Sequence, residues 1–88
     1  MKTAFRESFA RDLKLVREKR LLQRVKEAIE TVEQADSMGD LSNFKKLKGG
    51  KNYFRLRVGD YRIGVALEEN TLVFVRFLNR KDIYKYFP

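Results

Sequence analysis

One change of hydrophobic period, near residue 52, constrains the fold of this chain more than any other feature. Between residues 20 and 35, apolar side chains recur at the i, i+3, i+4, i+7 spacing of an amphipathic helix. From residue 53 the period becomes two, which is typical of a strand with one buried face. Helical segments followed by a run of strands predict an α+β fold, with two helices packed on one face of an antiparallel sheet.

The helical half contains two predicted helices, over residues 6–19 and 20–35. No glycine or proline separates them, so the position of the break near Arg17–Arg20 stays open. The second pattern is longer and more regular than the first. The apolar stripe of the first helix consists of Phe9, Leu13 and Val16, and that of the second of Leu21, Leu22, Val25, Ala28, Ile29 and Val32.

Three shorter segments flank the periodic regions. Residues 2–5 are either an edge strand or the lead-in to the first helix. Residues 36–52 contain turn formers and two apolar anchors, Leu41 and Leu47, which predict a connection with one helical turn. Residues 79–88 are expected to close the chain with a short turn or helix.

The strand half alternates between a core face and an outer face. The first strand runs up to a tight turn at Gly59-Asp60, and the second strand follows that turn. Residues 71–78 form a third strand, which is apolar on both faces and therefore interior. Residues expected on the core face are Phe54, Leu56, Val58, Tyr61, Ile63, Val65 and Leu67. Residues expected on the outer face are Tyr53, Arg55, Arg57, Arg62, Gly64 and Ala66.

Residue types absent from the chain exclude several kinds of site. The 88 residues predict one domain, 1–88, without cysteine or histidine, so we expect no disulfide, no thiol chemistry, no metal site and no cofactor. No apolar run approaches the ~18 residues of a membrane span. The beginning of the sequence carries acids and lacks the apolar run of a signal peptide, so we expect a cytoplasmic protein.

The net charge of +8 is unevenly distributed and favours a polyanion or an acidic protein as partner. Between residues 45 and 62, seven basic residues stand against one acid, Asp60. Glu27, Glu30 and Glu33 instead give the second helix an acidic bias. The expected RNA-binding residues in this region are Lys45, Lys46, Lys48, Lys51 and Tyr53.

The outer face of the hairpin should gather three arginines, because cross-strand neighbours lie only ~5 Å apart. We interpret Arg55, Arg57 and Arg62 as an anion site, on the argument that Gly64 and Ala66 leave a flat floor beside them. The alternative is a solvated basic face, partly neutralised by Asp60 and Glu68.

The segments KLKG, YFRLRVGDYRIG and FVRFLNRKDIYKYFP resemble the RelE branch of the RelE/ParE toxin superfamily. The resemblance covers most of the chain, although the two helices match only in pattern. It implies a βααβββ fold and a toxin that a cognate antitoxin holds inactive, with the grooves along the helices as plausible antitoxin seats. RelE-type members enter the ribosomal A site and cut mRNA there, whereas ParE-type members inhibit DNA gyrase. The DYR and NRKDIY segments favour the nuclease branch.

The resemblance also implies the catalytic residues. Arg62 matches the arginine of the family's YR motif, and Arg80 and Tyr84 match the arginine and tyrosine of its HRKxxY motif. Arg55 and Arg57 stand where the family has basic residues on the preceding strand.

Two departures from the family weaken proton transfer. Asn79 replaces the histidine before the motif arginine, and arginines replace the lysines of the best-studied members on the strand. Arginine remains protonated at neutral pH and cannot act as a base. Tyr84 and Lys51 or Lys48 remain as acid–base candidates, because nearby positive charge favours the phenolate and the neutral amine.

The same departures leave two other interpretations open. The chain could be a gyrase inhibitor or a degenerate toxin whose basic face only binds an antitoxin. It could also be an RNA-binding module without a toxin role.

Overall fold

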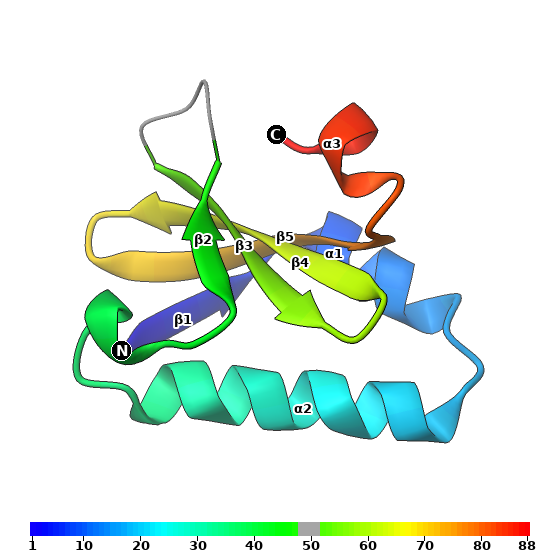
Figure 1. Ribbon diagram of the computed structural model, residues 1–88, viewed down its shortest axis with the longest axis horizontal. Helices are drawn as coiled ribbons and strands as arrows, with labels where there is room; N and C mark the ends of the chain where they lie inside the picture. The colour runs from blue at the N-terminus through cyan, green and yellow to red at the C-terminus, as the bar shows by residue number, and fades with distance from the viewer. Residues whose placement is uncertain (48–51) are drawn as a thin grey trace.

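The computed structural model describes residues 1–47 and 52–88, which form a five-stranded sheet with helices on both of its faces (Figure 1). The strand order is β1-β5-β4-β3-β2. The strands are β1 (Lys2–Phe5), β2 (Phe44–Lys46), β3 (Tyr53–Val58), β4 (Tyr61–Glu68) and β5 (Thr71–Asn79). The helices are α1 (Glu7–Lys14), α2 (Lys19–Gln34), the 3-10 turn η1 (Met38–Asp40) and α3 (Ile83–Tyr86).

Both predicted helices are present, and α1 is shorter than expected. It ends at Lys14, where the backbone N–H of Leu15 closes the last turn on Asp12 and Leu13. The chain is extended at Glu18 before α2 begins, so the break lies at residues 15–18 and redirects the chain along the sheet. None of the helices in the described ranges is long and apolar enough to cross a membrane.

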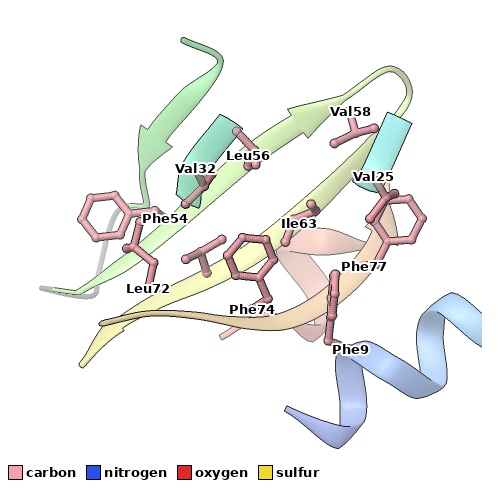
Figure 2. Packing of buried hydrophobic residues seen from close by; sticks show 11 residues of the cluster. Phe9, Val25, Val32, Phe54, Leu56, Val58, Ile63, Leu72, Phe74 and Phe77 are labelled. Carbon is pink, nitrogen blue, oxygen red and sulfur yellow. The ribbon is translucent and has the colours of Figure 1, made fainter. Parts of the chain in front are cut away.

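The main hydrophobic core lies between the two long helices and the sheet. Phe9 of α1 and Val25 and Val32 of α2 pack with the buried side chains of three strands (Figure 2). Ile63, on the middle strand, is completely buried. Burying one such side chain stabilises the fold by about 1.5–3 kcal/mol. The strand residues of this core are Phe54, Leu56, Val58, Ile63, Val65, Leu72, Phe74 and Phe77. The predicted alternation of β3 and β4 is therefore confirmed.

The sheet is antiparallel as expected, except at one edge. Residues 2–5 form an edge strand that pairs with β5 in parallel, from Lys2 opposite Thr71 to Phe5 opposite Phe74. The other strand pairs are antiparallel. As predicted, β5 is an interior strand. Two parallel strands need a long connection between them. Here α1 and α2 carry the chain from β1 to the opposite edge of the sheet, and β2, β3 and β4 lead it back to β5, beside β1.

The connection predicted over residues 36–52 contains a strand that the sequence did not indicate. The expected helical turn is η1. After it, β2 extends the sheet beyond β3, and the ring of Phe44 stacks on Phe54 with centroids 4.9 Å apart. Three residues are too few to establish a period of two, and only the pairing with β3 makes them a strand.

The second face of the sheet carries α3, on the side opposite α2 (Figure 1). This short helix confirms the expected closing segment. Leu47, Ile83 and Phe87 form a separate buried cluster there, against which Tyr53, Val75 and Leu78 pack. The outer face of the sheet is therefore partly covered, and the basic residues occupy what remains.

Candidate nucleic-acid interface

Strand register places the predicted arginines together on the outer face. Arg57 lies directly opposite Arg62 across β3 and β4, and Arg55 lies opposite Gly64. On the other side of β3, Lys45 of β2 lies opposite Arg55. These pairs share one face because directly opposed residues in an antiparallel sheet point the same way. Four cations from three strands are thus brought together.

These side chains line a small pocket of about 190 Å³. Its lining consists of Asn43, Lys45, Arg55, Arg57 and Arg62. Within residues 1–47 and 52–88, the ion pairs join Arg6 to Glu68 and Arg76 to Asp12, and none involves the pocket. The predicted neutralisation by Glu68 is therefore wrong, since its carboxylate is held by Arg6. A pocket lined with positive charge suits a phosphate group.

Arg62 is the most constrained of these arginines. Its Nη1 donates hydrogen bonds of 2.9 Å to the carbonyl oxygens of Gly59 and Tyr61. Burial, followed by the charges of Arg55, Arg57 and Arg80, lowers the pKa of Arg62, while Tyr84 acts in the opposite direction. The charges that act on Arg62 thus come from β3, from α3 and from the turn between β5 and α3.

Arg80 is brought to the same turn by the backbone. Its N–H donates a 2.9 Å hydrogen bond to the carbonyl oxygen of Asp60, two residues before Arg62. We call Arg55, Arg57, Arg62 and Arg80 the arginine cluster. The backbone of Arg80 therefore lies beside the turn that precedes Arg62, and the joint role of the two side chains stays a prediction.

Asn79 does not belong to the arginine cluster. It lies opposite Tyr61, whose ring stacks on Phe77 in the core, so Asn79 is on the helix-covered face. Its Oδ1 accepts a 3.0 Å hydrogen bond from the N–H of Lys81 and thereby shapes the turn that carries Arg80. The departure from the family's histidine therefore affects a position that points away from the cluster.

Tyr84 of α3 stands beside the cluster and is 62% exposed. The Arg55 Cζ lies 5.5 Å from the centroid of its ring, which is a cation–π distance. A second pocket, of about 390 Å³, opens between β2 and α3. Its lining consists of Lys45, Lys46, Leu47, Arg55, Tyr84, Phe87 and Pro88. It offers an apolar surface next to the positively charged pocket, with which it shares Lys45 and Arg55.

Other predicted RNA-binding residues have different placements. Lys45 and Lys46 are exposed on β2 and line the second pocket. Tyr53 instead packs edge-on against Phe87, with centroids 5.6 Å apart, in the smaller hydrophobic cluster. Lys48 and Lys51 lie outside the described residues.

The flat open floor predicted at Gly64 and Ala66 is wrong. Both residues are buried, and the ring of Phe87 covers Gly64. Phe87 is 4% exposed and packs over the central strand. Alternation correctly assigned the face, but it could not show that a segment more than twenty residues later covers that face.

Two residues near the pocket were not indicated by the sequence. Asn43 lines it, and its carbonyl oxygen accepts a 2.9 Å hydrogen bond from the N–H of Arg57. The guanidinium of Arg24 reaches the β3–β4 turn, where its Nη1 would lie 2.7 Å from a Cβ added at Gly59. The position of Asn43 before a strand and its positive φ of 60° fit a turn residue. The position of Arg24 follows only from how α2 crosses the sheet.

Comparisons with known proteins match nearly the whole chain. A family model for the ParE toxin of the parDE type II toxin-antitoxin system matches residues 4–84. Toxin RelE3 of Methanocaldococcus jannaschii is 45% identical over 89 residues, spanning 100% of both proteins. The toxin in a RelB-RelE antitoxin-toxin complex from Methanococcus jannaschii has a TM-score of 0.80 and 41% identity, over 97% of this chain and 99% of that chain. An archaeal RelE-RelB complex from Pyrococcus horikoshii has a TM-score of 0.72 at 18% identity, over 90% and 93%, and supports the fold alone.

Proposed function

This chain belongs to the RelE/ParE superfamily of type II toxins, and we propose that it is a metal-independent, ribosome-dependent mRNA endonuclease that inhibits translation. The observation that carries the proposal is a positively charged pocket lined by Arg55, Arg57 and Arg62 together with Lys45. The ring of Tyr84 lies beside Arg55, and the backbone of Arg80 is bound at the turn that precedes Arg62. Guanidinium groups bind phosphate oxygens through paired hydrogen bonds. A site of this composition is suited to stabilising charge on phosphorus.

The proposed reaction uses the substrate's own 2′-OH as nucleophile. The 2′ oxygen forms a bond to the adjacent phosphorus while the bond from phosphorus to the 5′ oxygen breaks. The 2′-OH loses a proton and the departing 5′ oxygen gains one, which leaves a 2′,3′-cyclic phosphate and a 5′-OH. The protein must stabilise the pentavalent phosphorane and assist both proton transfers.

The arginine cluster divides into two groups in this mechanism. Arg62 and Arg80 stabilise the phosphorane, because Arg62 is held rigidly by Gly59 and Tyr61 and Arg80 is anchored at the same turn. Arg55 and Arg57 hold the scissile or flanking phosphates from β3, and Lys45 and Lys46 extend that contact along β2. Fixed positive charge near developing negative charge is the largest contribution to many such reactions.

Proton transfer is the weaker part of the site. Four side chains in the described ranges act electrostatically on Arg62, and three of them are arginines. The fourth is Tyr84, which can exchange a proton more readily than arginine. We assign it proton transfer or stacking on a base, both of which its exposed ring permits. Strong electrostatics with weak acid–base groups makes the enzyme depend on alignment of the substrate. Holding mRNA in the ribosomal A site would supply that alignment, which can contribute about 7–11 kcal/mol.

The first experiment compares free and ribosome-bound RNA. The purified protein is incubated with naked mRNA and with a translating extract, and 5′ ends are mapped against the reading frame. We expect cleavage in frame on ribosomes and negligible cleavage of free RNA. Rapid cutting of the naked RNA would contradict the ribosome-dependent mechanism.

The second experiment tests the site. Arg80→Ala should relieve growth arrest and abolish cleavage, while circular dichroism and melting temperature stay near those of the parent. Lys26→Ala removes the same charge from the exposed surface of α2 and should remain fully toxic. Equal toxicity of the two variants would show that the assignment of Arg80 is wrong.

A cognate antitoxin is the proposed protein partner. The relative from Methanococcus jannaschii, at 41% identity, crystallised as a RelB-RelE complex, and we extend that partnership to this chain. Such a protein would act in the cytoplasm, where translating ribosomes are found. Co-expression with the antitoxin encoded beside it should abolish the growth arrest.

Inhibition of DNA gyrase is the second candidate. It is favoured by the match to a ParE toxin family model and by the scarcity of acid–base groups in the described part of the arginine cluster. A supercoiling assay separates the two. Loss of gyrase activity at toxin concentrations that leave mRNA intact would select this alternative.

A further inference from the structure

The central strand of the sheet contains a glycine that an aromatic ring covers directly. Gly64 is paired on both sides, with Arg55 of β3 and Arg76 of β5. A Cβ added there would lie 2.6–2.8 Å from the Cγ, Cδ2 and Cδ1 atoms of Phe87, which is closer than carbon atoms pack. Glycine within a strand is unfavourable unless another group must approach the backbone. In this fold the approaching group is Phe87.

The contact fixes the position of α3 on the sheet. Ile83 and Phe87 are four residues apart and bury on the same side, with exposures of 0% and 4%, and the N–H of Phe87 donates to the Ile83 carbonyl oxygen. The Tyr53 ring packs edge-on with the Phe87 ring, with centroids 5.6 Å apart. A four-residue helix has no stability of its own, so these two anchors determine its orientation.

Tyr84 follows the first anchor directly and depends on both. Its ring is largely exposed, and its described neighbour on the site is Arg55, at 5.5 Å from the centroid. Arg55 is also the residue directly opposite Gly64. The contact of Phe87 with Gly64 therefore sets how far α3, which carries Tyr84, lies from Arg55 on the neighbouring strand.

We propose that Phe87, seated on Gly64, is a positioning residue that holds Tyr84 against Arg55 in the geometry required for RNA cleavage. The effect of Phe87 on catalysis rests on the proposed function. The placement of Tyr84 by Phe87 can be tested without any activity. Gly64 serves as the seat, since any side chain at that position would displace the ring.

The experiment uses three variants of the full chain: Gly64→Ala, Phe87→Leu and the double variant. Ring resonances of Tyr84, assigned by NMR in isotopically labelled protein, report its position. We expect Gly64→Ala to shift them and the double variant, with a smaller side chain over the added methyl group, to return them toward the parent. If Gly64→Ala fails to fold, Phe87→Leu alone tests whether Phe87 positions Tyr84, and it should shift the same Tyr84 resonances.

Ribosome-dependent cleavage provides the second measurement. Gly64→Ala should lower kcat about 10–100-fold with little change in KM, because small displacements of a reacting group have effects of that size. The double variant should recover part of the loss. A parent protein that cuts no RNA would refute the proposed function, whereas the resonances would still test the positioning.

A double-mutant cycle separates positioning from general stability. If Phe87 acts through Tyr84, adding Gly64→Ala to Tyr84→Ala should cause no further loss of kcat. Val65→Ala is the matched control, because Val65 is next to Gly64 in β4 but packs in the main core. Its loss of kcat should add to that of Tyr84→Ala. Unshifted Tyr84 resonances in Gly64→Ala and Phe87→Leu, or full additivity of Gly64→Ala with Tyr84→Ala, would overturn the proposal.

Discussion

At the scale of single residues, the site is held together against its own electrostatic repulsion. Arg57 and Arg62 are directly opposed like charges, and the pKa of Arg62 is lowered by burial and then by Arg55 and Arg57. A lowered pKa means that the charged guanidinium is less favourable in the fold than in the unfolded chain. The resulting cost to stability is present at all pH values below the folded-state pKa of Arg62. It is relieved only as the pH rises through that value, far above neutrality.

Removing one of the opposed charges should therefore stabilise the protein. We expect Arg57→Gln to raise the free energy of unfolding at neutral pH and low salt by about 0.2–0.5 kcal/mol, a small effect because Arg57 is exposed. The gain should disappear near 1 M salt, where the screening length is ~3 Å. Urea unfolding at both salt concentrations measures it. Arg20→Gln, on the exposed surface of α2, is the control and should change little.

At the scale of elements, α1 completes an edge of the sheet that β1 leaves open. The pairing of β1 with β5 ends at Phe74. Beyond it, the hydroxyl of Ser8 donates to the Val75 carbonyl oxygen, and Asp12 accepts a 2.9 Å hydrogen bond from the Phe77 N–H. Polar side chains of a helix thus satisfy backbone groups that a strand would otherwise pair. The same Asp12 carboxylate binds Arg76 at 2.7 Å.

Asp12 should therefore contribute more to stability than an ordinary surface carboxylate. We expect Asp12→Ala to lower the free energy of unfolding by about 2 kcal/mol, because it leaves a backbone N–H and a partly buried guanidinium without their acceptor. Glu68→Ala removes the carboxylate of the pair with Arg6, in which both side chains are about half exposed, and should cost below ~1 kcal/mol. Thermal or urea unfolding compares the two, and equal losses would contradict the role given to Asp12.

At the scale of the whole molecule, positive charge is concentrated on the outer face of the sheet, whereas the four basic residues of α2 are nearly balanced by three acidic ones. The arginine cluster and Lys45 lie on the outer face of β2, β3 and β4, whereas exposed acidic residues lie on α2, across the sheet (Figure 1). The acidic residues in that helix are Glu27, Glu30 and Glu33. This polarity should orient the protein as it approaches a polyanion.

Binding of single-stranded RNA should reveal the number of phosphates that the outer face contacts. The logarithm of the affinity should fall with the logarithm of salt concentration, with a slope of about −0.7 per phosphate. Lys45→Gln should reduce the magnitude of the slope by about 0.7, and Lys26→Gln should leave it unchanged. Fluorescence anisotropy over a salt series measures both. Identical slopes for these two variants would exclude Lys45 from the interface.

Three features could be predicted from the period of consecutive residues alone. They are the two helices, the faces of β3 and β4, and the clustering of Arg55, Arg57 and Arg62. The resemblance to a family of toxins added Arg80, whose N–H is bound to Asp60, and Tyr84, whose ring lies 5.5 Å from the Arg55 Cζ.

The remaining features depend on contacts between distant segments and could not be predicted from the sequence. It placed β1 parallel to β5, made a strand of Phe44–Lys46, seated Phe87 on Gly64 and brought Arg24 to the β3–β4 turn. Each of these features joins segments far apart in the chain. A local period specifies which way a side chain points, but the segment that covers it is selected by packing of the whole molecule.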